Sequence, residues 1–164
     1  MVEASCIGTI GILRECKNKW ERRVSLTPKE VRVLVAANIR VLVQPSSIRC
    51  YSDDEFIDAG AVINEDVSEA SVIFGVKEVP IPNLMANKTY FFFSHTIKAQ
   101  DYNMDLLDKL KELKIRMIDF ECIREPRVPG KMSQRLVAFG RYAGIAGAFD
   151  FLRGIGEFLL QKQY

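Results

Sequence analysis

The feature that most constrains this chain is the alternation of short apolar runs with stretches of helical periodicity. The runs are too short for helices and suit buried strands. They cover residues 7–13, 40–43, 72–76, 90–93 and 117–120. Strands that alternate with helices are typical of a parallel sheet covered by helices. The sequence therefore predicts an α/β fold of Rossmann-like, flavodoxin-like type, with a mainly parallel sheet, helices on both faces and three layers.

Local signals give the ends of the first helices. Residues 27–30 (Thr-Pro-Lys-Glu) combine a capping threonine, a proline at the first helical position and a glutamate that completes a capping box. Residues 52–55 (Ser-Asp-Asp-Glu) repeat the capping box. We expect the first helix to end at Asn38 and the second to end at Gly60, because these residue types favour helix ends.

The second half of the chain contains two further helical patterns. Met104, Leu107, Leu110 and Leu113 are spaced to line one face of a helix. A loop is expected at residues 126–133, and helical spacing then continues from Tyr142 with no glycine or proline cap before residue 164. We therefore interpret residues 1–164 as a single domain and expect a further domain to follow.

Composition narrows the classes of function. The chain has 164 residues, 48% apolar, and a net charge of +2 from 23 basic and 21 acidic residues, with no basic stripe for nucleic acid or membrane lipid. Its four cysteines lie far apart, which favours free thiols, and one histidine without a cysteine cluster argues against zinc. No apolar run approaches the roughly 20 residues of a membrane helix.

Polar residues follow three of the predicted strands. Lys77 and Glu78 come after the third run, His95 after the fourth and Glu121 after the fifth. In parallel sheets the carboxyl ends of strands form the ligand-binding edge. Each residue alone also fits a plain structural role, such as a solvated lysine or a core histidine. Their coincidence at three strand ends predicts a shared site.

Arginine and glycine complete the list of candidates. Arg23 and Arg135 suit carboxylates, because the guanidinium fork donates two parallel hydrogen bonds. Gly154 and Gly156 begin a pattern like a dinucleotide fingerprint, but they stand inside a helical pattern and the third glycine is absent. We therefore expect no cofactor-binding residues in this chain.

The chain resembles the N-terminal domain family of alanine dehydrogenase and transhydrogenase. Within that family it is similar to the saccharopine branch, the lysine–2-oxoglutarate reductase (lysine-ketoglutarate reductase) parts of the bifunctional α-aminoadipic semialdehyde synthases. The matching stretches are residues 20–28, 75–80, 88–100, 118–121, 135–140 and 143–147. The pattern around Lys77 is shared across the family, whereas residues 94–100 are more specific to the saccharopine branch.

The resemblance implies a reaction: L-lysine and 2-oxoglutarate condense, and NADPH reduces the imine to saccharopine. It implies Lys77 and His95 as the acid/base pair, with Glu78 and Glu121 modulating charge. It also implies substrate-binding positions, which are Arg23, Gln100, Arg135 and Phe139. Gln134 stands where some fungal relatives have a second, cofactor-contacting arginine, which slightly favours the reductase over the lysine-forming enzymes.

The same resemblance implies the surroundings of the domain. A Rossmann domain would follow it and hold most of the NADPH, and a saccharopine dehydrogenase portion would lie in the same polypeptide. The animal relatives imply the mitochondrial matrix, with the cytoplasm as the alternative, and a homo-oligomer is compatible. The isolated chain would be catalytically inactive. The rival interpretations are an alanine dehydrogenase, a lysine-forming saccharopine dehydrogenase, or a non-enzymatic flavodoxin-like interaction module.

Overall fold

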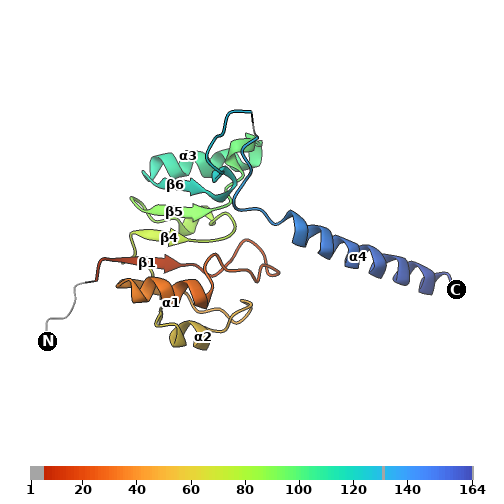
Figure 1. Ribbon diagram of the computed structural model, residues 1–164, viewed down its shortest axis with the longest axis horizontal. Coiled ribbons are helices and arrows are strands. Elements are labelled where there is room, and N and C mark those ends of the chain that lie inside the picture. The colour runs from red at the N-terminus through yellow and green to blue at the C-terminus, as the bar shows by residue number, and fades with distance from the viewer. Residues whose placement is uncertain (1–5, 131, 164) are drawn as a thin grey trace. The chain divides into compact units, whose positions relative to one another are not determined.

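The computed structural model describes residues 6–130 and 132–163. These residues form two compact units, one up to Cys122 and the other from Ile123 onward. The first unit holds the sheet and three of the α-helices, and the second holds the long helix α4 (Figure 1). The first unit carries most of the candidate site.

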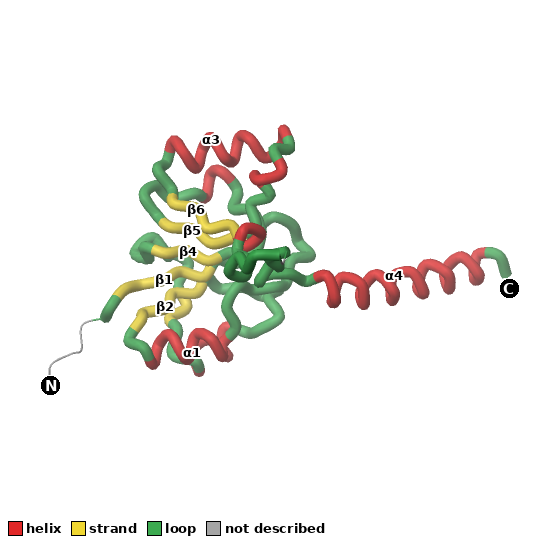
Figure 2. The backbone as a smooth tube through the Cα atoms, turned by 45° about the horizontal axis from the view of Figure 1, so that its top comes forward, coloured by secondary structure: helices red, strands yellow, loops and turns green. Residues whose placement is uncertain are grey.

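The first unit is built on a parallel sheet. Its strands are β1 (Gly8–Ile12), β2 (Ile39–Val43), β3 (Val62–Ile63), β4 (Val72–Phe74), β5 (Thr89–Phe92) and β6 (Arg116–Asp119). The sheet has six strands in the order β3-β2-β1-β4-β5-β6, and every pairing is parallel (Figure 2). The order reverses between β1 and β4, where doubly wound sheets have their ligand-binding crevice.

Helices cover both faces of this sheet, as predicted. Alternate side chains of a strand point to opposite faces. Val41 and Val43 therefore share one apolar cluster with Val31 of α1 (Pro28–Ala36) and Phe56 of α2 (Asp53–Asp58). The intervening Leu42 belongs to a second cluster that contains residues of α3 (Met104–Glu112). The three-layer architecture is confirmed.

The predicted helix signals are found in the structure. In α1 the backbone N–H of Thr27 donates to the Glu30 carboxylate at 3.1 Å, and Ser52 makes the equivalent bond with Glu55 at 2.7 Å in α2. Asn38 follows α1 with φ of 61°, and Gly60 follows α2 with φ of 90°. Gly60 is required there, because this φ strains any side chain and a Cβ atom would lie 2.9 Å from Val35.

The sequence analysis missed one strand and predicted the buried face of one helix incorrectly. Strand β3 was not predicted, because two residues, Val62–Ile63, are too short to give a periodic signal. The buried side of α3 is formed by Leu106 and Leu110, whereas Leu107 is 36% exposed. Residues spaced strictly three apart shift by about 60° per step around an α-helix, so the predicted set does not stay on one face, whereas Leu106 and Leu110 are one turn apart.

The second unit contains the long helix expected near the end of the sequence. Helix α4 spans Gly140–Gln161, so it starts two residues before the predicted Tyr142. It ends at Gln161, and Gln163 has a φ of 60°, a left-handed conformation that terminates helices. The sequence had given no sign of this stop. The four cysteines of the chain are exposed and none is joined in a disulfide. The sequence had predicted free thiols and had made no prediction of their exposure.

Candidate active site

The candidate residues of the first unit stand at adjacent strand ends. Lys77 and Glu78 follow β4, His95 follows β5 and Glu121 lies in the turn after β6. Because β4, β5 and β6 are neighbours and parallel, their carboxyl ends share one edge of the sheet. The positions of these residues at three neighbouring strand ends are therefore as predicted, whereas the shared site stays a prediction.

His95 and Glu78 form a direct contact. His95 Nδ1 lies 2.7 Å from Glu78 Oε1, and the Glu78 side chain is only 9% exposed. Lys17 Nζ lies 3.8 Å from the other oxygen of Glu78. The Phe93 ring stacks beside the imidazole at 6.5 Å between centroids. The imidazole is thus held by a buried carboxylate on one side and an aromatic ring on the other.

The backbone of His95 is strained. Its φ and ψ are 57° and 7°, a left-handed conformation that is unfavourable for a residue with a Cβ atom. Such conformations persist only where the surrounding structure imposes them, and they are frequent at functional sites. The strain strengthens the functional interpretation of this histidine over a plain core role.

Lys77 is held through its backbone by a residue that the sequence analysis missed. Glu15 accepts hydrogen bonds from the N–H groups of Val76 and Lys77, at 2.6 and 2.9 Å. Burial raises the pKa of Glu15, and these two hydrogen bonds oppose that rise. Within the part of the chain that the structure describes, Lys77 Nζ has no hydrogen-bond or ion-pair partner. Among the described residues, no carboxylate therefore forms an ion pair with this amine, although its charge acts on Glu21 from a longer distance.

Arg23 contacts a second carboxylate that was not predicted. Its Nε and Nη2 atoms donate to the two oxygens of Glu21, each at 2.7 Å. The Glu21 side chain is 8% exposed. The hydrogen bonds from Arg23 lower the pKa of Glu21, and the nearby Lys77 charge lowers it further. Arg23, the predicted carboxylate ligand, is thus oriented by an internal carboxylate close to Lys77.

Of the other predicted residues, Glu121 and Gln100 lie in the first unit, and Arg135 and Phe139 lie in the second. Glu121 Oε1 lies 3.5 Å from Lys98 Nζ, and Gln100 accepts a hydrogen bond from Tyr102 at 2.7 Å. Arg135 and Phe139 belong to the second unit, where Arg135 pairs with Arg124 in a β-bridge and Phe139 precedes α4. The assigned roles of these residues remain predictions.

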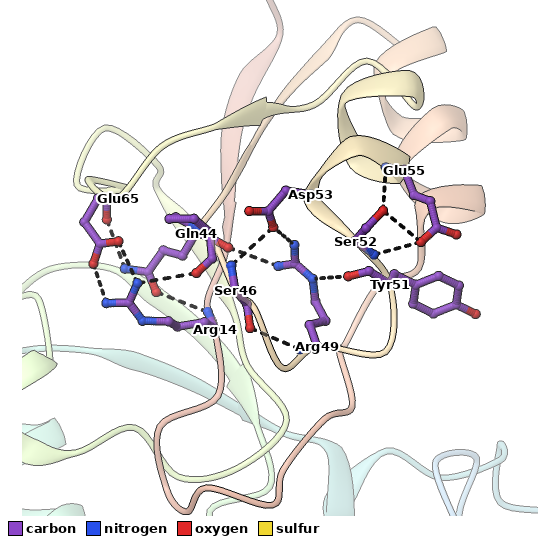
Figure 3. Close-up of polar contacts among 10 residues, drawn as sticks. Arg14, Gln44, Ser46, Arg49, Tyr51, Ser52, Asp53, Glu55 and Glu65 are labelled. Carbon is purple, nitrogen blue, oxygen red and sulfur yellow. Dashed lines mark hydrogen bonds and ion pairs between the residues drawn. The ribbon is translucent and has the colours of Figure 1, made fainter.

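A second polar network lies at the carboxyl ends of β1, β2 and β3 (Figure 3). Arg14 donates to both carboxylate oxygens of Glu65, at 2.6 and 2.5 Å. Arg49 is buried and donates to the carbonyl groups of Tyr51 and Gln44, each at 3.0 Å. It also pairs with Asp53, which completes its surroundings. The sequence analysis did not single out this network.

The structure supports the rejection of the glycine pattern near the end of the chain. Gly154 and Gly156 lie inside α4, whereas a phosphate-binding turn connects a strand to a helix. Among residues 6–130 and 132–163, no group of three histidine, cysteine or acidic side chains is arranged to bind a metal ion. Over the same residues, no helix has both the length and the apolar character to span a bilayer.

Comparison with known proteins identifies the class. The family described as "Alanine dehydrogenase/PNT, N-terminal domain" matches residues 11–146. A solved L-alanine dehydrogenase superposes on 72% of this chain and 34% of its own, with a TM-score of 0.63 and 25% identity. A transhydrogenase from Sinorhizobium meliloti covers 74% of this chain and 36% of its own, with a TM-score of 0.61 and 18% identity, which shows the fold alone. The chain belongs to the alanine dehydrogenase/PNT N-terminal domain family.

Curated relatives with similar sequences match most of this chain. The mitochondrial α-aminoadipic semialdehyde synthase of Mus musculus is 45% identical over 151 residues, which are 92% of this chain and 16% of that protein. The Arabidopsis thaliana synthase is 41% identical over 92% of this chain and 14% of its own length. A lysine-forming, NAD⁺-dependent saccharopine dehydrogenase of Yarrowia lipolytica is 32% identical over 83% of this chain and 37% of its own. The chain thus spans a small part of these relatives.

Proposed function

We propose that this chain is the substrate-side domain of a lysine–2-oxoglutarate reductase that forms saccharopine in lysine catabolism. Support comes from its relatives, two named α-aminoadipic semialdehyde synthase and one named a saccharopine dehydrogenase that forms L-lysine. The observation that carries the proposal is the His95–Glu78 contact of 2.7 Å, at the strand end next to the one that presents Lys77. An acid/base reaction needs such a pair of proton carriers.

The proposed reaction forms one C–N bond and releases one water molecule. The lysine ε-amine attacks the keto carbon of 2-oxoglutarate, and a proton must leave the nitrogen while another reaches the oxygen. The resulting carbinolamine loses its hydroxyl group as water, which again requires a proton donor. The nicotinamide cofactor supplies the hydride that reduces the imine carbon. The domain therefore has to hold the dicarboxylate and move protons at nitrogen and oxygen.

His95 is suited to proton transfer at the leaving oxygen. In the proposed mechanism the Glu78 carboxylate accepts the hydrogen bond of 2.7 Å and His95 Nδ1 donates it, so that Nδ1 carries a proton. Nε2 is then the ring nitrogen that exchanges a proton with the substrate. Glu78 fixes both the tautomer and the orientation of the ring, as carboxylates do for catalytic histidines.

Lys77 is assigned to proton transfer at the substrate nitrogen. Its backbone is fixed by Glu15, and its amine is not engaged by any carboxylate of the described residues. Arg23, oriented by Glu21, is assigned to a carboxylate of the substrate, together with Gln100, Arg135 and Phe139. Glu78 and Glu121 supply the negative charge that balances the cations of this site.

The cofactor is proposed to be NADPH, bound by a separate Rossmann domain that follows this one. Support comes from the relatives, which are dehydrogenases of which this chain matches only a part. Gly154 and Gly156 lie within α4 and not in a turn between a strand and a helix, where dinucleotide phosphates bind. A saccharopine dehydrogenase portion in the same polypeptide and a homo-oligomer belong to the same proposal. Three mammalian relatives are named mitochondrial, which supports a mitochondrial location, and the matrix is the compartment that we propose. The isolated chain would then be inactive.

A chimera tests this function. The 151 matching residues of the mouse synthase are replaced by those of this chain. NADPH oxidation is measured with lysine plus 2-oxoglutarate, and alanine-forming conditions (ammonia plus pyruvate) serve as the specificity control. We expect lysine- and 2-oxoglutarate-dependent turnover within about tenfold of the mouse enzyme, since a tenfold change corresponds to only about 1.4 kcal/mol. A folded chimera that reduces pyruvate with ammonia, or neither pair, contradicts the proposal.

A further inference from the structure

A buried hydrogen bond joins the ends of β5 and β6 beneath the candidate site. Ser94 Oγ donates to Asp119 Oδ2 at 2.5 Å. The Ser94 residue is fully buried and Asp119 is 9% exposed. The two residues are 25 positions apart in the sequence, and Asp119 is paired with Phe92, two residues before Ser94. The bond therefore connects two turns that the parallel sheet only brings near each other.

Each end of this bond also fixes the turn that follows it. Ser94 Oγ accepts from the backbone N–H of Thr96 at 3.1 Å, and so spans His95. Asp119 Oδ1 accepts from the backbone N–H of Glu121 at 2.8 Å. One buried carboxylate thus holds the backbone of two residues assigned to the site, His95 indirectly and Glu121 directly.

These hydrogen bonds can keep the strained backbone of His95 in its observed conformation. A left-handed φ of 57° is unfavourable for histidine, so other interactions must keep it. The hydrogen bonds of Ser94 enclose this residue from both sides, since Ser94 precedes it and Thr96 follows it. Without the Asp119 carboxylate, the Ser94 hydroxyl would lose its buried acceptor and the turn could relax to an ordinary conformation.

We propose that Ser94 and Asp119 are positioning residues for the acid/base site: through the β5 and β6 turns they hold His95 against Glu78 and hold Glu121 beside Lys98. This inference deepens the proposed function and rests on it for its catalytic meaning. Neither residue is assigned to touch the substrate. Their effect is to keep the imidazole in the geometry that the 2.7 Å contact with Glu78 requires.

The first test needs no activity, because His95 is the single histidine of the 164-residue chain. In the isotopically labelled chain, the HN–Hα coupling and carbon shifts of His95 report its φ. The imidazole ¹⁵N shifts report the hydrogen bond at Nδ1. Ser94→Ala and Asp119→Asn should both move these signals toward a residue with negative φ and a solvated ring. The matched controls are Ser71→Ala and Asp108→Asn, whose exposed side chains contact Thr9 and Lys111.

The second test measures turnover in the mouse chimera. Both variants should lower kcat about tenfold, less than the roughly 10²–10⁴-fold contribution of an acid/base group itself, and change KM for 2-oxoglutarate much less. Two variants are used so that a failure of Asp119→Asn to fold leaves Ser94→Ala as the test. Unchanged His95 signals in a folded Ser94→Ala chain overturn the positioning role, whatever the turnover. Displaced His95 signals with normal turnover support positioning and instead contradict the role of His95 in the proposed reaction.

Discussion

The two polar regions along the carboxyl edge of the sheet differ in how their charges are balanced. At β1–β3, Arg14 is paired with Glu65, and buried Arg49 is paired with Asp53 and two carbonyl groups (Figure 3). At β4–β6, Glu78 holds His95, while the amine of Lys77 has no carboxylate partner among the described residues. The first region neutralises its charges internally and stabilises the fold. The second also contains ion pairs, of Glu78 with Lys17 and of Glu121 with Lys98, but among the described residues none reaches the Lys77 amine. This is the arrangement that we propose for an acid/base site.

The largest effect on turnover is expected for Lys77. In the mouse chimera, Lys77→Met should lower turnover by about 10²–10⁴-fold, the usual contribution of a positioned acid/base group. Binding of saccharopine should weaken much less, because its carboxylates are assigned to the arginines. Steady-state kinetics and calorimetry measure the two effects separately. Lys88→Met, at the opposite end of the sheet before β5, is the control. Turnover within a few-fold of the unsubstituted chimera would show that Lys77 is only a solvated residue at a strand end.

For Arg49 we expect a substitution to lower the stability of the fold and not to affect substrate binding directly. Its side chain is 3% exposed and lies over the Phe56 ring at 4.4 Å. Arg49→Met removes the partner of Asp53 and of two carbonyl groups, and should lower the free energy of unfolding by about 3 kcal/mol. Urea denaturation of the 164-residue chain measures this. Arg14→Met, at a side chain 42% exposed, should have a much smaller effect. A stable Arg49→Met protein that no longer binds saccharopine would reverse the assignment of the two regions.

Arg23 should affect substrate binding more than turnover. In the chimera, Arg23→Ala should raise KM for 2-oxoglutarate by about 10–100-fold, the equivalent of one charge-assisted contact of roughly 1.5–3 kcal/mol. The neighbouring Arg22, which donates to the carbonyl of Ile48 at 2.9 Å, provides the matched control Arg22→Ala. If turnover falls and KM for 2-oxoglutarate stays constant, Arg23 is not the carboxylate ligand.

The smallest effect is a pH dependence of stability at Glu21. Its pKa in the folded protein is lowered, mainly by the hydrogen bonds from Arg23, so its charged form stabilises the fold. This contribution is complete above the ordinary glutamate pKa of about 4.3 and disappears as pH falls through the lower folded pKa. Glu21→Gln should cost about 1 kcal/mol at pH 7 and nothing in strong acid. Exposed Glu112→Gln is the control. A cost that persists below the folded pKa contradicts this linkage.

Much of the fold was predictable, because its signals are local in the sequence. The capping boxes at residues 27–30 and 52–55, and the stops at Asn38 and Gly60, depend on residues within a few positions of each other. Lys77, His95 and Glu121 were predictable at the sheet edge for a related reason, since each directly follows an apolar strand.

The partners of these residues were not predictable in the same way. Glu15 contacts residues 61 and 62 positions away, and Ser94 contacts Asp119 at a separation of 25, so no sequence period records either pair. One available signal was overlooked: Glu15 also follows an apolar strand, β1, and the rule applied to Lys77 would have selected it. In α3, Leu110 is buried as predicted but Leu107 is not, because a repeat of three residues drifts by about 60° per step around the helix.

The most direct test of the central claim is hydrogen exchange in the chimera, measured by mass spectrometry with and without saccharopine in the presence of NADP⁺. Both polar regions lie on the same edge of the sheet, so the measurement shows at which of the two the ligand binds. Slower exchange is expected in residues 75–79 and 93–98, around Lys77, Glu78 and His95, and no change is expected in residues 44–55. Protection confined to residues 44–55, around Arg49, or protection nowhere in this domain, would contradict the assignment of the site.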